Sequence, residues 1–192
     1  MACSLRIMTL QGKSLLDKRT KAEMIALLPR LRRFARGLTG SEEEADDLVQ
    51  AACERAIQRI GQWQPGTRLD SWMFRIMQNL WIDAIRVGKL RGSHLSLVDP
   101  DGQKAPGMDG EKATMNRLTL EAVRRGVQRL PPDQRSVLLL VCVEGCSYKE
   151  TAETLGIPVG TVMSRLSRAR LALNRMVGGS ETSILAAEGR EA

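Results

Sequence analysis

The sequence predicts an all-α protein made of two small helical bundles joined by a flexible linker, the second containing a helix-turn-helix. Aromatic residues make up only 3% of the 192 residues, so aliphatic side chains and methionine must fill any core, which suits helices better than sheets. Apolar residues recur at three- and four-residue spacing along both halves. A stretch rich in glycine and proline over residues 87–114 indicates a linker, because long structureless segments are uncommon inside one compact domain.

Three amphipathic helices are expected in the first half, and they can close on one another. The first begins near residue 21 and ends at Gly40, a favourable C-cap. Ser41 and Glu44 form a capping box for the second, and Asp70 is the expected N-cap of the third, which runs to about residue 88. The residues expected in the core of the last two are Ala45, Leu48, Val49, Ala52, Ala56, Ile60, Met73, Met77, Leu80 and Ala84.

Helices are also expected in the second half, over residues 116–130 and 133–143. They are followed by a short helix capped by Ser147, a tight turn at Gly156 and a longer helix that ends near Val177. This spacing is typical of a helix-turn-helix, in which the first helix supports the second and the second lies in the major groove of DNA.

The second helix of this pair carries small polar residues and arginines, and acids are absent between residues 155 and 180. Such a surface fits base edges and phosphates. Arg168 is the expected base contact, since a guanidinium can donate two hydrogen bonds to guanine, whereas a purely solvating role for the arginines is the simpler alternative. The predicted duplex-binding residues are Thr161, Ser164, Arg165, Ser167, Arg168 and Arg170.

A basic and polar stripe is predicted on the third helix of the first half. Arg75, Asn79, Ile82 and Arg86 fall on one helical face, flanked by Gln78, next to a loop that contains a tryptophan. Basic groups can follow the phosphates of a single strand while a planar or apolar pocket holds an unstacked base. The predicted strand-binding residues are Trp63, Arg68, Arg75, Asn79 and Arg86.

The second helix of the first half opens with five carboxylates in six positions, which are Glu42, Glu43, Glu44, Asp46 and Asp47. Negative charge is favourable at a helix N-terminus. A metal-dependent nuclease would also use carboxylates, but catalytic carboxylates normally converge from separate elements, and these share one turn without a nearby histidine. A docking face for a basic partner surface is the better interpretation.

The overall charge and the cysteines further restrict the class of protein and the kind of partner. A net charge of +7 and a pI near 9.7 favour a polyanionic partner. No apolar run approaches the length of a membrane span, the N-terminus is too polar for a signal peptide, and four cysteines without a framework fit a cytoplasmic protein. Cys142 and Cys146 could be imagined as metal ligands, but the one histidine, His94, lies in another segment, so buried thiols and no metal or cofactor are expected.

These patterns, in this order, resemble the extracytoplasmic-function (ECF) sigma factors of bacterial RNA polymerase, within the sigma-70 superfamily. The resemblance covers roughly residues 21–178. Two features depart from the usual pattern: Met163 stands where a lysine or arginine is usual, and Trp81 is bulkier than the residue usual at its position. The matching blocks are residues 45–50, 72–83, 130–135, 147–152 and 159–170.

The resemblance implies a division of the chain and a role for each part. Residues 21–90 would be a region-2-like domain for core polymerase and the minus-ten element, with a flipped base captured near Trp63. Residues 91–115 would be the linker, and residues 116–178 a region-4-like domain for the minus-thirty-five duplex. An extension, 1–20, and a tail, 179–192, would flank them. The residues expected to contact the clamp helices of the polymerase are Asp46, Asp47, Leu48 and Gln50.

The resemblance therefore implies a protein that is not an enzyme. It would bind core RNA polymerase and promoter DNA, direct promoter recognition, melting and initiation, as in stress responses, and be controlled by an anti-sigma factor. The alternative is an autonomous helix-turn-helix regulator that binds duplex operators without polymerase.

Overall fold

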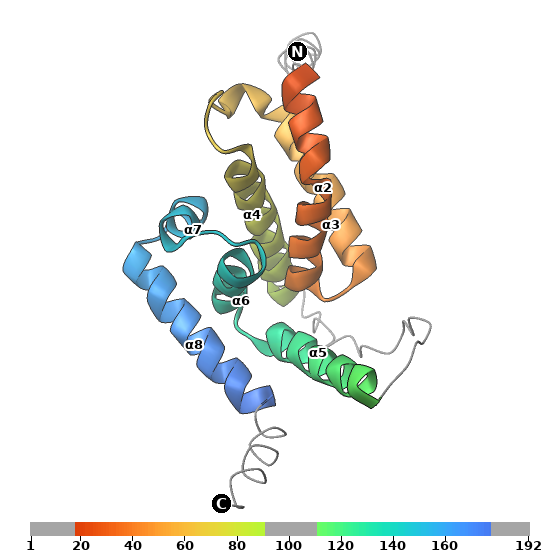
Figure 1. Ribbon diagram of the computed structural model, residues 1–192. Coiled ribbons are helices and arrows are strands. Elements are labelled where there is room, and N and C mark those ends of the chain that lie inside the picture. Colours follow the sequence, from red (N-terminus) through yellow and green to blue (C-terminus); the bar gives the residue numbers. More distant parts are fainter. Residues whose placement is uncertain (1–17, 91–110, 178–192) are drawn as a thin grey trace, which may run out of the picture.

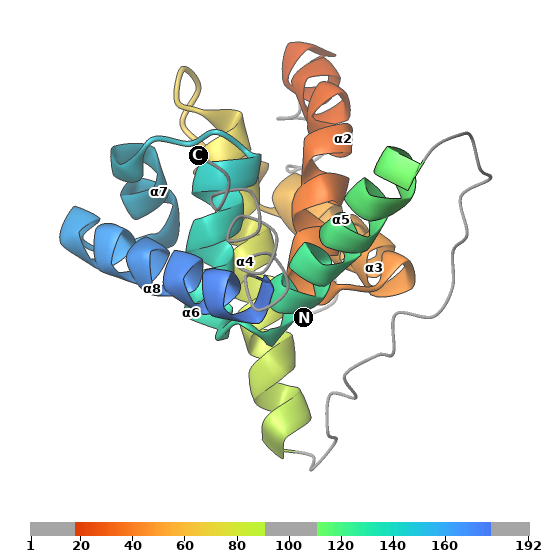
Figure 2. The ribbon, with the colours of Figure 1, turned by 60° about the horizontal axis from the view of Figure 1, so that its bottom comes forward.

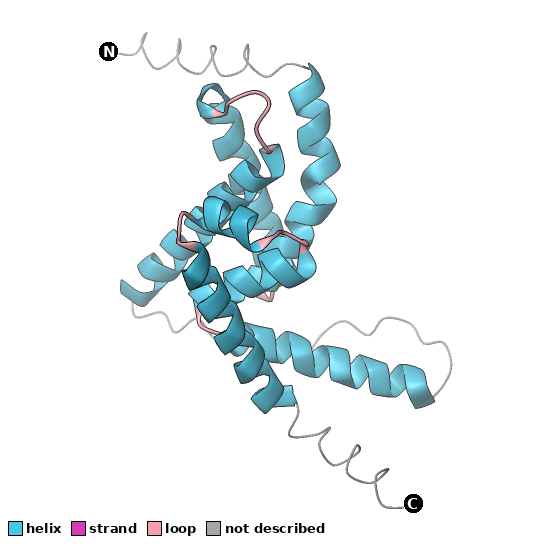
Figure 3. Ribbon diagram, turned by 60° about the vertical axis from the view of Figure 1, so that its left-hand side comes forward, coloured by secondary structure: helices cyan, strands magenta, loops and turns pink. Residues whose placement is uncertain are grey.

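The computed structural model describes residues 18–90 and 111–177, and every regular element in these two ranges is helical (Figures 1 and 3). This confirms the all-α prediction. The elements, in chain order, are α2 (Lys18–Thr39), α3 (Glu42–Gln58), the 3-10 turn η1 (Ile60–Gln62), α4 (Leu69–Leu90), α5 (Glu111–Arg129), α6 (Pro132–Leu138), the π-helical turn η2 (Leu139–Val143), α7 (Tyr148–Leu155) and α8 (Val159–Val177).

The first half is a bundle of α2, α3 and α4 around a core that contains most of the predicted apolar positions. Phe34 and Phe74 meet edge to face at its centre, with ring centroids 5.0 Å apart. Leu48 and Leu80 are only half-buried and Ala84 is exposed. The prediction of Ala84 as core is wrong because the last turns of α4 project beyond the other helices (Figure 2).

The predicted helix boundaries hold at Gly40 and Ser41, but differ at Asp70 and at the end of the helix expected over 133–143. Gly40 has a φ of 82° and ends α2, and the Ser41 hydroxyl accepts a hydrogen bond from the amide of Glu44 at 3.4 Å. Asp70 is not an N-cap but lies in the first turn of α4, where arginines bind its carboxylate. The π-helical turn η2 replaces the end of the α-helix expected over 133–143.

Part of the predicted linker is helical, because α5 begins at Glu111. The remainder of the predicted linker, residues 91–110, lies outside the described residues. So do residues 1–17 of the predicted extension, residue 178 and the predicted tail, 179–192.

The second half is built around α8, which packs against α5, α6 and α7. The capping box predicted at the start of α7 is present: the Ser147 amide donates to Glu150 Oε2 at 2.7 Å, and the Glu150 amide donates to Ser147 Oγ at 3.2 Å. Gly156 has a φ of 66°, which confirms the tight turn before α8. The core of this half contains Leu130, Val137, Leu138, Ala152, Val162, Leu166 and Ala169.

The two halves lie against each other rather than apart. In Figure 1, α7 lies beside α4 and α6 lies between α8 and the first bundle, while α2 also contacts α5 and η2. Leu139, Leu140 and Cys146 belong to the same buried cluster as the core of the first bundle. Leu139 packs closely against Gly37, where an added Cβ would lie 2.6 Å from Leu139 Cδ2, so only a glycine fits here without movement of the leucine.

None of the helices in the described ranges combines the length and the apolar character that a membrane span requires.

The left-handed conformation of Gly156 leads to a stability prediction. The Gly156→Ala substitution should lower the free energy of unfolding by about 1 kcal/mol, because a Cβ is disfavoured at positive φ. The matched control is Gly160→Ala in the first turn of α8, where φ is not positive and no atom lies within 4 Å of the added Cβ. Urea denaturation followed by circular dichroism measures both, and equal losses for the two variants would contradict the assignment of the strain to Gly156.

Candidate nucleic-acid interface

The outer face of α8 presents most of the predicted duplex-binding residues. Val162, Leu166 and Ala169 are buried and hold the opposite face of the helix in the core, as its periodicity predicts. Thr161 and Ser164 are half-buried, and the Ser164 hydroxyl donates to the Thr161 carbonyl at 3.1 Å. Three of the predicted residues are exposed, and these are Ser167, Arg168 and Arg170.

The arginines of α8 differ in what they contact. Arg165 is half-buried and pairs with Asp133 at the start of α6, at 2.8 Å. Arg170 donates a long hydrogen bond to Cys142 Sγ at 3.7 Å. Arg168 forms no ion pair within the described residues. Its guanidinium is therefore available to an external ligand.

Two apolar side chains add to the outer surface of α8. Val159 is 41% exposed and Met163, one turn further, is 53% exposed. Met163 occupies the position where the resemblance leads one to expect a cation, so this part of the helix offers apolar contact and no charge.

The predicted strand-binding stripe lies on α4, but the second half covers part of it. Asn79 and Arg86 are exposed. Arg75 donates to the carbonyl oxygens of Glu153 and Thr154 at the end of α7, the latter at 2.9 Å. Gln78 was expected at the edge of the stripe, but it is buried and accepts a hydrogen bond from Ser136 Oγ at 2.7 Å.

Trp63 is more buried than its position in a loop suggests. The side chain is half-buried and packs against the core of the first bundle. Its indole N–H is buried and has no hydrogen-bond acceptor within the described residues. Arg68, at the end of the same loop, pairs with Asp70 at 2.7 Å and also with Glu150 of α7.

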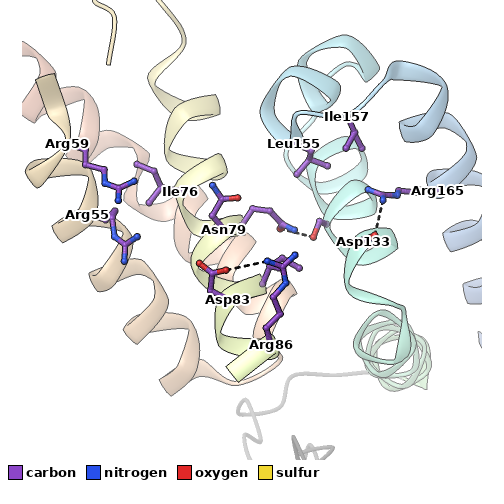
Figure 4. A pocket seen from close by; sticks show the side chains of 13 residues that line it. Arg55, Arg59, Ile76, Asn79, Asp83, Arg86, Asp133, Leu155, Ile157 and Arg165 are labelled. Atoms are coloured by element: carbon purple, nitrogen blue, oxygen red, sulfur yellow. Dashed lines mark hydrogen bonds and ion pairs between the residues drawn. The ribbon is translucent and has the colours of Figure 1, made fainter. Parts of the chain in front are cut away.

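A cleft of about 470 Å³ separates α3 and α4 from the second half (Figure 4). Asn79 and Arg86 line one wall and Arg165 lines the other, so predicted strand-binding and duplex-binding residues face one cavity. Arg55 and Arg59, from the end of α3, extend the basic lining and have no ion pair in the described chain. Sequence reasoning missed both, although the change of α3 from an acidic start to a basic end is visible in the sequence.

The predicted polymerase-contacting residues lie together on α3. Asp46, Asp47 and Gln50 are exposed and Leu48 is half-buried. Asp46 lies 3.5 Å from Arg32, and Gln50 donates to Glu54 at 3.0 Å. In the described parts of the chain, no group of three or more histidine, cysteine or acidic side chains is arranged to hold a metal ion.

The cysteines only partly fit the prediction of buried thiols. Cys146 is buried, which raises the pKa of its thiol, and Cys53 is half-buried. Cys142 is exposed, so the prediction is wrong there, because η2 turns it toward Arg170 and away from both cores.

A network of ion pairs joins the first bundle to the second half. The Glu144 carboxylate, between η2 and α7, is fully buried and receives hydrogen bonds from Arg30 and Arg33 of α2. Arg30 also donates to Asp70 at 3.0 Å. Burial opposes ionisation of Asp70, but hydrogen bonds from Arg68, Arg30 and the Ser71 amide outweigh it, and its pKa is lowered to about 2.

A second polar contact joins the end of α2 to the second half. Arg135 donates to the carbonyl of Leu38, and Gln128 Nε2 donates to the carbonyl of Gly37 at 2.9 Å. The Arg135 guanidinium also lies over the ring of Trp81, 5.4 Å from its centroid. Burial lowers the pKa of Arg135 to about 10, which still leaves it protonated at neutral pH.

Each half of the chain is similar to a known protein family. Residues 120–173 match the family described as Sigma-70, region 4, and residues 24–78 match the family described as Sigma2 domain of PhyR. The ECF RNA polymerase sigma factor EcfG of Rhodopseudomonas palustris is 37% identical over 161 residues, which cover 83% of this chain and 86% of the relative. SigM of Mycobacterium tuberculosis is 33% identical over 155 residues, covering 80% of this chain and 74% of the relative.

Solved structures of the same kind are also similar. The sigma factor RpoE from Bartonella quintana, solved in complex with the anti-sigma factor NepR, superposes with a TM-score of 0.70 at 28% identity, covering 85% of this chain and 99% of that one. CnrH, solved with the cytosolic domain of CnrY, has a TM-score of 0.63 at 25% identity, covering 91% and 97%.

A helix-turn-helix beside a second bundle lined with arginines has the features of a DNA-binding protein. The relatives make the class specific: the chain belongs to the ECF sigma factors of the sigma-70 family. Its function is thus that of a sigma factor, which binds core RNA polymerase and directs initiation at promoters, rather than that of an operator-binding regulator acting alone.

The lowered pKa of Asp70 makes part of the stability depend on pH. A carboxyl whose pKa is depressed on folding stabilises the protein above its unfolded value, near 3.8, and this contribution is lost as the pH falls toward about 2. Asp70→Asn should therefore be less stable than the parent at about pH 6, and the difference should shrink between about pH 4 and pH 2. Thermal unfolding across this range measures it, with Glu121→Gln on the surface of α5 as control. A difference that stays constant with pH would contradict the assignment.

Proposed function

We propose that the two halves of this sigma factor divide promoter recognition. Residues 116–178 bind the minus-thirty-five element as duplex through α8. Residues 21–90 hold the opened minus-ten strand along α4 and dock on the polymerase through α3. The chain acts without catalysing a reaction itself, in the cytoplasm, where the polymerase works.

The proposal that α8 binds duplex DNA rests on its outer face. It combines an exposed guanidinium on Arg168, the hydroxyl of Ser167 and the apolar side chain of Met163, while the opposite face is fixed in the core. Guanidinium and hydroxyl groups can bind base edges and phosphates, and an apolar side chain can contact a thymine methyl. Thr161, Ser164, Arg165 and Arg170 complete the proposed contact surface.

The strand-binding surface is proposed to be longer than the sequence pattern alone indicates. Asn79 and Arg86 are exposed on α4, and Arg55 and Arg59 continue the basic surface onto α3 along the same cleft (Figure 4). Asp83, which lies 3.7 Å from Arg86, and Asp133 also line the cleft, but arginines outnumber these acids. Cations suit the phosphates of a single strand. Arg68 and Arg75 belong to this surface but are paired with the second half, so the halves must separate before these two residues can bind DNA.

The acidic surface of α3 is the proposed contact with core polymerase. Asp46, Asp47 and Gln50 project from one side of the helix, and Leu48 adds an apolar edge beside them. Such a surface complements a basic partner, and complementary charge favours both encounter and register.

An anti-sigma factor is the proposed regulatory partner. RpoE and CnrH are similar to this chain along most of its length. RpoE was solved with the anti-sigma factor NepR, and CnrH with the cytosolic domain of CnrY. A partner that covers either DNA-binding surface would prevent initiation.

Arg168 provides the test of the duplex assignment. Arg168→Ala should reduce transcription from a cognate promoter roughly tenfold, since one base contact contributes about 1–3 kcal/mol. Run-off transcription with core polymerase measures this, on promoters identified by sequencing the transcripts that the parent protein initiates on genomic DNA. Arg175→Ala, an exposed arginine at the far end of α8, is the matched control. Equal activity of the parent and Arg168→Ala would refute the assignment.

Asp47 provides the test of polymerase docking. Asp47→Arg should weaken binding to core polymerase by about tenfold or more, because it places a cation against a surface proposed to be basic. Fluorescence anisotropy of labelled core polymerase titrated with the chain gives the affinity. Glu121→Arg makes the same charge change on α5 and should bind like the parent, so similar weakening of both would point to a nonspecific effect of charge.

A further inference from the structure

The Glu144 carboxylate is the point where the second half is tied to the first. Its side chain has no exposed surface, and it receives hydrogen bonds from Arg30 Nε at 3.1 Å and from Arg33 Nε and Nη2 at 2.9 and 3.0 Å. The two arginines lie on α2, more than 110 residues earlier in the chain. Both keep contact with water, since their side chains are 32% and 52% exposed.

The ion pairs continue from Glu144 to the start of α7. Arg30 binds Asp70 in α4, Asp70 binds Arg68, and Arg68 binds Glu150 in the first turn of α7. The segment from Glu144 to Glu150 is therefore fixed at both ends to the first bundle. We call Glu144, Arg30 and Arg33 together the interdomain latch.

The position of α7 determines what is covered on α4. With its N-terminus fixed by Glu150, α7 directs the carbonyl oxygens of Glu153 and Thr154 at Arg75. These oxygens occupy the place where, under the proposed function, phosphate or base oxygens of the minus-ten strand would bind. Arg68 is occupied in the same way. The chain's own α7 thus takes the place of the DNA strand at two of the proposed strand-binding residues.

The interface between the halves is of a kind that can open. Much of it consists of ion pairs and hydrogen bonds, including Ser136 to Gln78 and Gln128 to the Gly37 carbonyl. Its apolar part consists of Leu139, Leu140 and Cys146, which are buried in the cluster of the first bundle, and of Val127 and Leu155, which pack against that cluster. Charged groups recover hydration when such an interface separates, so the net stabilisation is modest, and polar interfaces of this kind permit relative motion of domains.

We propose that the interdomain latch holds the chain in an autoinhibited closed state, in which α7 occupies Arg68 and Arg75 of the strand-binding surface. The inference rests on the proposed function of α4 as the strand-binding surface. Closure lowers the apparent affinity for single-stranded DNA in proportion to the fraction of open molecules. Breaking the latch raises that affinity without any change in the DNA-contacting residues.

Glu144→Gln tests the latch in the full chain, because it keeps the shape of the side chain and removes its charge. The expected results are a larger radius of gyration in small-angle X-ray scattering and faster hydrogen exchange in α7. The affinity for a fluorescein-labelled single strand, covering the minus-ten region of a cognate promoter, should rise at least threefold in anisotropy titrations. Glu121→Gln, an exposed position on α5 with the same change of charge, should behave like the parent.

A charge exchange separates a lost ion pair from general damage. Arg30→Gln with Arg33→Gln should open the chain as Glu144→Gln does. Glu144→Arg alone should open it further, and adding Arg33→Glu should restore the closed dimensions. Scattering and exchange equal to those of the parent in all of these variants would overturn the latch.

The DNA measurements distinguish the latch from the strand assignment on which it rests. If Glu144→Gln opens the chain but the strand binds no tighter, occlusion by α7 is overturned. If binding tightens and Asn79→Ala in the opened chain weakens it again, both proposals are supported. If binding tightens and Asn79→Ala changes nothing, the α4 surface is wrongly assigned, while the scattering still supports the latch.

Discussion

A fully buried carboxylate determines how the two halves of this sigma factor meet. Removing the Glu144 side chain from water is costly unless cations compensate its charge. Removing one partner of a buried ion pair typically costs several kcal/mol of stability. Arg30 and Arg33 compensate that charge from α2, so the segment between η2 and α7 must face that helix. This placement brings α7 alongside α4, where Arg68 pairs with Glu150 and Arg75 donates to the carbonyl oxygens of Glu153 and Thr154.

The π-helical turn η2 makes that placement compatible with two cores. Val137 and Leu138, at the end of α6, belong to the core of the second half, whereas Leu139 and Leu140 join the core of the first bundle. A π-turn inserts an extra residue into the helical repeat and shifts the direction of the side chains that follow. One short helical segment therefore contributes side chains to two hydrophobic clusters. Gly37 leaves the space into which Leu139 packs.

The local structure could be predicted from the sequence because its signals are local. Apolar spacing gave the faces of α3, α4 and α8, the serine and glutamate pair marked the start of α7, and Gly156 marked the turn. The family could also be recognised from motifs that lie within these elements. The predicted bounds of the helices were wrong by only a few residues, except where the helix expected over 133–143 changes to η2. A π-turn leaves no pattern in the apolar spacing.

The relation between the halves could not be predicted in this way. Glu144 pairs with arginines more than 110 positions away, and no periodicity links the two sites. For the same reason the burial of Gln78 and the exposure of Cys142 were missed, because each depends on what packs against the helix rather than on the helix itself. Arg55 and Arg59 are a different case: their place at the basic end of an acidic helix was visible in the sequence, but the cleft that brings them beside Asn79 was not.

The closed arrangement has a consequence for where DNA binding can occur. Arg165, Asn79 and Arg86 line one cleft, so residues proposed to bind the minus-thirty-five duplex and residues proposed to bind the minus-ten strand face each other. Arg165 is paired with Asp133 in this cleft, whereas Ser167 and Arg168 are exposed on the outer face of α8, so the closed chain presents only part of the proposed duplex surface. Opening costs free energy, and two linked sites gain effective concentration only when their geometry allows both to be occupied at once. Under the proposed function, core polymerase is the scaffold that holds the halves in that geometry, so we expect specific promoter binding from the complex rather than from the chain alone.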